Sequence, residues 1–269
     1  MTTANPPVIL NPIAALGAIV ISSVKEMGAL FIFFFHGLRL IFSSRKIFAK
    51  IIHQVYFIGV KSLFVIGLIG IFTGMVLGLQ GYYTLTKFGS EGLLGAAVAL
   101  SLIRELGPVL TAIMITGRAG SSMAAEIGIM RITDQIDALD VMDIEPMSYL
   151  VSPRIAASFI CFPLLTAFFD VIGILGGYVT GVGLLGVNGG VYFHRIETTV
   201  KLVDVTGGFY KSFMFAAIVA TVSCYQGYFT HLRTDGMGPE GVSNSTTAAV
   251  VHSCVLVLVS DYVLTSFLL

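Results

Sequence analysis

Five long apolar segments most constrain what this chain can fold into. They cover residues 55–82, 92–117, 150–186, 206–230 and 246–268. Each is long enough for a helix to cross about 30 Å of hydrocarbon, which takes about 20 apolar residues. The chain is 56% hydrophobic and only 11% charged, whereas soluble domains carry about 25% charged residues. The sequence therefore predicts an all-α integral membrane protein with five transmembrane helices.

The N-terminal segment, residues 1–50, is distinct from the transmembrane domain, which we assign to residues 51–269. Its apolar centre, GALFIFFFHGL, covers only residues 28–38 and is too short to cross a bilayer. Basic residues flank this centre, as they do in helices that lie in a membrane surface. We therefore predict an N-terminal interfacial amphipathic helix, with a sixth transmembrane span as the alternative.

The distribution of Lys and Arg predicts the orientation of the chain. With five spans, one side of the membrane holds the N-terminal segment and the connections 118–149 and 231–245. That side carries most of the basic residues outside the spans: Lys25, Arg39, Arg45, Lys46, Lys50, Arg118, Arg131 and Arg233, with Arg154 at its border. The other side has Lys87, Arg195 and Lys201. Because positive charge accumulates on the cytoplasmic side, we expect the N-terminus in the cytoplasm and the C-terminus outside.

Ionisable residues also lie inside the predicted spans, where a charge costs at least about 2.5–3.5 kcal/mol. Arg104 and Glu105 interrupt the second span, Lys211 lies in the fourth and Asp261 in the fifth. Asp170 lies in the third span. Adjacent residues of a helix point about 100° apart, so Arg104 and Glu105 need not pair with each other. We predict cross-helix pairs of Glu105 with Lys211 and of Arg104 with Asp261.

Two interpretations of this charged cluster stay open. The cluster is either a network that holds the second, fourth and fifth spans together or the polar wall of a substrate cavity that opens outward. Pro108 follows Arg104 closely and leaves a backbone carbonyl without its helical donor. This break favours a kink and a cavity in the second span.

Two ladders of glycine repeat at every fourth residue. They consist of Gly70, Gly74 and Gly78 in the first span and of Gly173, Gly177 and Gly181 in the third. Residues four apart share one face of a helix, so each ladder forms a smooth groove. The pattern is compatible with close packing of another helix and with binding of an acyl chain.

The connection 118–149 has apolar residues at roughly helical spacing. Four aspartates, Asp134, Asp137, Asp140 and Asp143, follow one another at every third position. They are compatible with a solvated face, with a Mg²⁺ site, or with a helix that docks on a soluble partner. We predict an amphipathic cytoplasmic helix over residues 120–140 that transmits force from such a partner.

Several function classes find no support in the sequence. The formal net charge is zero, so no basic field attracts nucleic acid. No phosphate-binding loop and no G-x-S-x-G or H-E-x-x-H motif occurs. Cys161, Cys224 and Cys254 lack the spacing of metal ligands. We expect neither a catalytic site nor a cofactor or metal in this chain, so a separate partner must supply energy.

Specific segments resemble a known family. They are GMVLGLQGY (74–82), ALSLIRELGPV (99–109), GRAGSSMAAEIGIMR (117–131), SPR (152–154) and VVHSCVLVLVSDYVLT (250–265). Together these segments closely resemble the MlaE/YrbE permease family of Mce-type ABC transporters, and the resemblance extends from about residue 50 to the C-terminus.

This resemblance implies partners and a location. Permeases of this family form homodimers in the inner membrane of bacteria with an outer membrane. They bind a cytoplasmic ABC ATPase, which carries ATP and Mg, often a STAS-domain protein, and an Mce-domain hexamer on the outside. They move phospholipids between the inner and outer membranes and help to maintain the lipid asymmetry of the outer membrane.

The resemblance also implies roles for particular residues. A lipid pocket at the dimer interface would be lined by Gly74, Leu77, Gly78, Tyr82 and Leu85, with Arg104, Glu105, Lys211 and Asp261 close by. The helix over 120–140 would couple to the ATPase through Glu126, Ile127, Met130, Arg131, Asp134 and Asp137.

Two other functions remain as alternatives. A secondary lipid transporter would use Glu105 and Asp261 as proton carriers and would work without an ATPase. A metal-dependent lipid-modifying enzyme would use the four aspartates from Asp134 to Asp143 and would require a divalent cation.

Overall fold

The computed structural model describes residues 11–41, 47–232 and 238–268. Every secondary-structure element in these residues is a helix, which confirms the predicted all-α class. Five of the helical segments are long and apolar enough to cross a membrane, as predicted: Phe48–Thr86, Glu91–Ile132, Met147–Leu184, Leu202–Tyr228 and Pro239–Leu268. Residues 1–10, Arg45, Lys46 and Arg233, which entered the sequence predictions, lie outside the described residues.

The helices follow one another along the chain with short connections. The N-terminal segment and first span contain α1 (Asn11–Leu40), α2 (Ile47–Ile58), η1 (Val60–Ser62) and α3 (Leu63–Thr86). The second span and the connection after it contain η2 (Glu91–Leu93), α4 (Leu94–Ser101), η3 (Leu102–Leu106), α5 (Gly107–Ile115), η4 (Thr116–Gly120), α6 (Ser121–Ile132) and α7 (Gln135–Val141). The remainder contains η5 (Met147–Val151), α8 (Ser152–Tyr178), η6 (Val179–Leu184), α9 (Gly189–Thr199), α10 (Leu202–Tyr228), η7 (Thr230–Leu232) and α11 (Pro239–Leu268).

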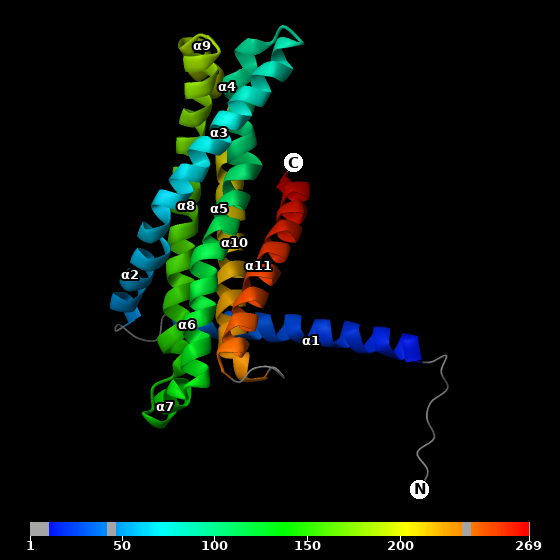
Figure 1. The fold of residues 1–269 in the computed structure, drawn as a ribbon, viewed down its shortest axis with the longest axis vertical. Coiled ribbons are helices and arrows are strands. Elements are labelled where there is room, and N and C mark those ends of the chain that lie inside the picture. Colours follow the sequence, from blue (N-terminus) through cyan, green and yellow to red (C-terminus); the bar gives the residue numbers. More distant parts are fainter. Residues whose placement is uncertain (1–10, 42–46, 233–237, 269) are drawn as a thin grey trace.

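The spans form an elongated bundle with α7 at one end and α9 at the other (Figure 1). We call these the α7 end and the α9 end. Helix α1 crosses the bundle near the α7 end, at a steep angle to the spans (Figure 1). Such an angle suits a helix that lies in the plane of a membrane surface.

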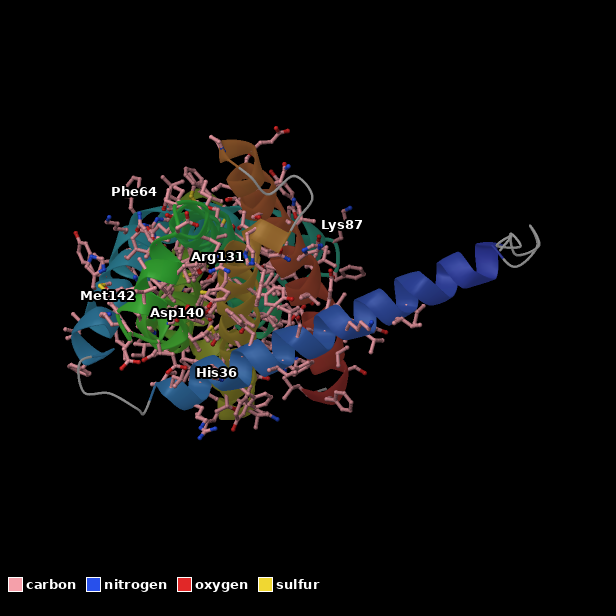
Figure 2. All side chains as sticks on the ribbon, turned by 90° about the horizontal axis from the view of Figure 1, so that it is seen from below. His36, Phe64, Lys87, Arg131, Asp140 and Met142 are labelled. Carbon is pink, nitrogen blue, oxygen red and sulfur yellow. The ribbon has the colours of Figure 1, made fainter. Side chains whose placement is uncertain are left out.

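Helix α1 packs on the bundle through its C-terminal half, where Phe33, Phe34 and Leu38 join a hydrophobic cluster and the Gly37 carbonyl oxygen accepts a hydrogen bond from Ser152. Phe33 is buried, and its ring lies 5.5 Å from the ring of Tyr225 and 5.9 Å from that of Tyr228. At its edge, Nε2 of His36 lies 3.0 Å from a carboxylate oxygen of Glu145; Figure 2 looks onto this end of the bundle. Phe31, on another face of the helix, is exposed. Helix α1 therefore carries apolar side chains both on the face that packs against the bundle and on an exposed face.

The two glycine ladders pack against each other where α3 meets α8. A Cβ added at Gly74 would overlap the carbonyl group of Gly173, and a Cβ at Gly78 would lie 3.1 Å from the carbonyl oxygen of Gly177. Both Gly74 and Gly78 are buried. Of the two alternatives for the ladders, the structure shows close helix packing, because within one chain the backbone of α8 occupies the groove.

The second span contains two turns with π-helical hydrogen bonding, η3 and η4. Pro108 lies in the first turn of α5, directly after η3. A π turn accommodates one extra residue and is common at functional sites. The break predicted from Pro108 is therefore present as a π turn, and it carries Arg104 and Glu105.

The predicted coupling helix over 120–140 is not one helix. Residues up to Ile132 continue the second span as α6. The backbone then turns at Asp134, whose φ of 56° lies in the left-handed region, and the short helix α7 begins at Gln135. Asp143 has a φ of 57° beyond the end of α7. The four aspartates therefore do not share one helical edge, because an Asp in the left-handed conformation ends a helix.

Candidate functional site

Lys211 on α10 is the centre of the charged cluster. Its ammonium group donates to Oε2 of Glu105 at 2.6 Å, to Oγ1 of Thr265 at 2.7 Å and to the carbonyl oxygen of Arg104 at 2.9 Å. An ammonium group has three N–H donors, so these contacts use all of them. The predicted pair of Glu105 with Lys211 is confirmed, and it joins the second, fourth and fifth spans.

The contact with the Arg104 carbonyl has a backbone cause. Pro108 has no N–H group, so the carbonyl of the residue four positions earlier, Arg104, has no α-helical donor. Lys211 supplies the missing donor from the neighbouring helix. A buried carbonyl without a partner costs about 1–3 kcal/mol, so Lys211 stabilises the break in the second span as well as the carboxylates.

The predicted pair of Arg104 with Asp261 is wrong. Arg104 instead binds Asp204 near the start of α10, with Nη2 and Nε at 2.7 and 2.8 Å from Oδ1. Asp261 lies 3.1 Å from Lys211. Arg104 and Glu105 point to different neighbours because they are adjacent in the helix. Asp204 was not among the predicted site residues, because the predicted fourth span began at residue 206. The signal was its position three residues after Lys201, where an acidic side chain is typical of a helix start. In the structure a carboxylate oxygen of Asp204 accepts a hydrogen bond from the Lys201 N–H at 2.9 Å.

A cavity of about 380 Å³ lies over this cluster. We call it the charged pocket; its lining residues are Arg104, Glu105, Lys201, Val203, Asp204, Gly207, Gly208, Lys211, Thr265 and Leu268. The side chains of Arg104 and Glu105 are 42% and 40% exposed, whereas that of Lys211 is 3% exposed. Lys211 therefore holds helices together, while Arg104 and Glu105 are accessible from the pocket.

The residues of the first span lie apart from this pocket. Gly74 and Gly78 contact α8, and Leu77, Tyr82 and Leu85 are partly buried against the main hydrophobic core. None of the five lines the charged pocket in the described part of the chain. Within one copy of the chain, the structure brings together Arg104, Glu105, Lys211 and Asp261 but not the predicted residues of the first span.

The predicted coupling residues at the α7 end mostly make contacts within the chain. Ile127 is buried, and Met130 packs against the core cluster beneath α1. Glu126 accepts from Nη2 of Arg154 at 2.8 Å. Ile127 and Met130 therefore pack within the chain and Glu126 joins α6 to α8, whereas the side chains of Glu126 and Asp137 stay 45% and 59% exposed.

Arg131 forms hydrogen bonds that join α7 to the connection after α10. Its Nη1 donates to Asp137 at 2.7 Å, and its Nε donates to Nδ1 of His231 at 2.9 Å. Partial burial, together with the charge of Arg131, lowers the pKa of His231 from its ordinary value. An imidazole that accepts at Nδ1 is neutral, in agreement with this direction.

The exposed apolar residues at the end of α7 were not among the site residues predicted from the sequence. Val141 is 88% exposed, and Met142 beside it is also exposed; Figure 2 labels Arg131, Asp140 and Met142 at this end. The apolar residues between and after Asp140 and Asp143 were the available signal, because apolar side chains that are exposed side by side, as Val141, Met142 and Ile144 are, mark candidate interaction sites.

Similarity to known proteins agrees with this architecture. The family model described as Permease MlaE matches residues 51–267. A protein of Haemophilus influenzae called intermembrane phospholipid transport system permease protein MlaE is 41% identical over 97% of this chain and 98% of its own length. A probable ABC transporter permease protein of Rickettsia typhi is 38% identical over 97% of this chain and 98% of its own length.

A plant protein is also similar. The chloroplastic protein TRIGALACTOSYLDIACYLGLYCEROL 1 of Arabidopsis thaliana is 35% identical over 68% of this chain and 51% of its own length. The matched family model covers all five candidate spans almost completely, and the bacterial relatives match over nearly their whole length. The chain belongs to the MlaE permease family.

Proposed function

We propose that this chain is the membrane-spanning permease subunit of an ATP-driven ABC transporter that moves phospholipids between the inner and outer membranes of a bacterium. The observation that carries the proposal is the charged pocket, in which Arg104 and Glu105 are half exposed inside a bundle of apolar spans. The name of the relative from Haemophilus influenzae supports the substrate class. Such a transporter would maintain the lipid asymmetry of the outer membrane.

The chemistry of the pocket suits a phospholipid head group. A guanidinium group forms paired, charge-assisted hydrogen bonds with phosphate oxygens, and Arg104 is the accessible arginine of the pocket. Glu105 can interact with an ammonium group of the same head group. Val203 and Leu268 at the border of the pocket offer apolar contacts for the first carbons of the acyl chains.

A homodimer would complete the pocket. Only 17% of the apolar stretch of the fifth span and 28% of that of the first are buried within the chain, against 44–50% for the other three. Leu268 and Thr265 of the fifth span line the charged pocket. Two copies that met through these spans would enclose the lipid and bring the first-span residues Leu77 and Tyr82 close to it.

The remaining partners follow from this assignment. A cytoplasmic ABC ATPase, which binds ATP and Mg, would dock at the α7 end and drive the pocket between two packed states. An Mce-domain hexamer would bind at the α9 end, and a STAS-domain protein would bind the ATPase. This arrangement would put the α7 end in the cytoplasm, as the distribution of basic residues predicts. The chain would then lie in the inner membrane.

The role of Arg104 can be tested by substitution. We expect Arg104→Gln to reduce phospholipid that co-purifies with the transporter by about tenfold, because a hydrogen bond to a charged group is worth about 1.5–3 kcal/mol. Bound phospholipid is measured by mass spectrometry after purification at matched expression, and folding is checked by thermal unfolding.

Asp204→Asn is the matched control for this test. It removes the ion pair of Arg104 but keeps the guanidinium charge in the pocket, so lipid binding should persist. An equal loss of lipid in both variants would show that Arg104 acts through the ion pair and does not bind the head group.

The docking surface at the α7 end can be tested separately. We expect Val141→Asp to weaken binding of the ATPase by about tenfold, equivalent to about 1.4 kcal/mol, because the substitution puts a charge into an apolar contact. Phe88→Asp alters another strongly exposed apolar residue, directly after α3 at the α9 end, and should leave binding unchanged. The readout is the amount of ATPase that co-purifies with the tagged permease. Transport without any bound ATPase would favour the proton-coupled alternative.

A further inference from the structure

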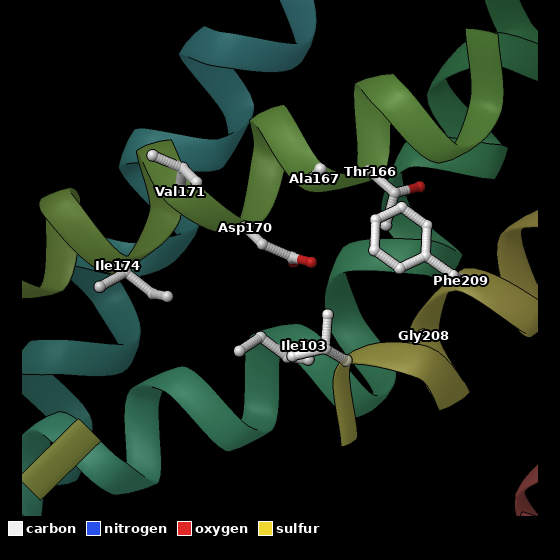
Figure 3. A pocket seen from close by; sticks show the side chains of 9 residues that line it. Ile103, Thr166, Ala167, Asp170, Val171, Ile174, Gly208 and Phe209 are labelled. Atoms are coloured by element: carbon white, nitrogen blue, oxygen red, sulfur yellow. The ribbon is translucent and has the colours of Figure 1, made fainter. Parts of the chain in front are cut away.

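A second cavity lies behind the charged pocket, between α8 and α10. It has a volume of about 170 Å³ and is shown in Figure 3. Its wall is apolar except for Asp170 and Thr166, which lie one helical turn apart on α8. Gly208 lines both this cavity and the charged pocket.

Asp170 and Thr166 are not satisfied by the described part of the protein. Oδ1 of Asp170 and Oγ1 of Thr166 are buried and have no hydrogen-bond partner there. Other buried threonines of the spans donate to the carbonyl four residues earlier, as Thr116 does at 2.7 Å and Thr221 at 2.6 Å. Thr166 lacks this contact, so its hydroxyl is left to interact with whatever occupies the cavity.

The charged groups nearby do not compensate Asp170. Arg104 and Glu105 on η3 and Asp204 and Lys211 on α10 pair with one another and with Asp261. The other helices packed against this part of α8, namely α3, α4 and α5, contain no Asp, Glu, Lys, Arg or His. Burial of an ionised carboxylate without a partner is far costlier than burial of a hydrogen-bonded neutral acid.

We propose that Asp170 and Thr166 form a proton-binding site in which the carboxyl group and the hydroxyl share ordered water within this cavity. The carboxylate takes its proton from a hydronium ion and leaves a water molecule, so that charge and atoms balance. The cavity has room for several water molecules at about 30 Å³ each, and Asp170 and Thr166 supply the two polar groups that hold such water. The acid, the hydroxyl and the water satisfy one another, which explains two otherwise unpartnered groups.

The position of the site connects it to the charged pocket. A Cβ at Gly107 would overlap the carboxyl group of Asp170, so this carboxyl group abuts the backbone just after the π turn. In Figure 3 the Asp170 side chain points away from α8 into the space between α8 and the segment that holds Ile103. Gain or loss of the proton therefore changes the contact that supports the turn bearing Arg104 and Glu105.

Infrared difference spectroscopy on the full chain in lipid nanodiscs tests this site without a transport assay. Between two pH values that bracket the titration, we expect a C=O band of a protonated carboxyl group that is lost in Asp170→Asn and shifted in Thr166→Val. Thr111→Val is the matched control, because Thr111 is also buried and unpartnered but does not line the cavity; it should leave the band unchanged.

Other results would overturn the proposal. A spectrum without such a band in the unmodified chain, or with a band that persists in Asp170→Asn, excludes a proton site at Asp170. A band that Thr166→Val leaves unshifted, in H2O and in D2O alike, excludes the shared water. None of these results depends on lipid binding at Arg104, so this test and that of the proposed function fail separately.

Discussion

Gly74→Ala is expected to prevent the chain from folding into a stable bundle. A single methyl group at this position would overlap the carbonyl group of Gly173, which belongs to the backbone of α8 and cannot rotate away. Overpacking in a core typically costs about 1–3 kcal/mol and occasionally more, and a clash with backbone belongs at the upper end of that range. The expected result is loss of monodisperse protein in size-exclusion chromatography after extraction in mild detergent.

Gly117→Ala, in the π turn η4 of the second span, provides the control. No atom lies within 4 Å of a Cβ added at Gly117, so this variant should purify like the unmodified chain. If Gly74→Ala folds normally and loses only bound lipid, the ladder lines a lipid groove and the α3–α8 contact is not as tight as described.

Lys211→Met is expected to cause a large loss of folding stability. It removes the donors for Glu105, Thr265 and the Arg104 carbonyl at once. Removal of one partner from a fully buried ion pair costs about 3–5 kcal/mol, because the remaining charge is left uncompensated. The cost here lies below that range, because the side chains of Glu105 and Asp261 are 40% and 18% exposed. The thermal unfolding temperature of the purified chain, followed by circular dichroism or by intrinsic tyrosine fluorescence, should therefore fall clearly.

A triple variant tests whether the uncompensated carboxylates, and not the changed shape of the side chain at position 211, cause the loss of stability. Glu105→Gln and Asp261→Asn, introduced together with Lys211→Met, remove the two carboxylates that Lys211 neutralises. We expect this triple variant to regain much of the lost stability, because neutral amides are cheaper to bury than unpaired carboxylates. Lys201→Met is the control for loss of a lysine at the border of the same pocket. A triple variant as unstable as Lys211→Met alone would contradict the ion-pair explanation.

The charged cluster shows how far pairing can be predicted. Glu105 and Lys211 could be matched because both are ionisable residues within predicted spans. Arg104 was assigned to Asp261, whereas it binds Asp204. The sequence shows which charges need partners, but the rotation of each helix about its axis decides which partner is within reach. That rotation depends on packing with every neighbouring helix.

The connection after the second span shows where prediction of helix boundaries from the sequence fails. Its apolar spacing predicted one helix, yet the chain turns at Asp134 and starts a new helix. Asp adopts the left-handed conformation at low cost, but it is also tolerated within a helix. Local preference therefore allowed both outcomes, and contacts such as that of Arg131 with Asp137 and His231 favour the turn.

The sequence by itself determined the helical class, the five spans and the family, because these depend on the length of apolar runs and on the order of residues along the chain. The tertiary structure alone decided that the glycine ladders meet each other, that Lys211 replaces the hydrogen bond missing at Pro108, and that Asp170 faces a cavity. Each of these depends on how helices far apart in the chain are rotated and stacked. Residue spacing within a single helix cannot specify that arrangement, because the same face can pack against a helix, a lipid or water.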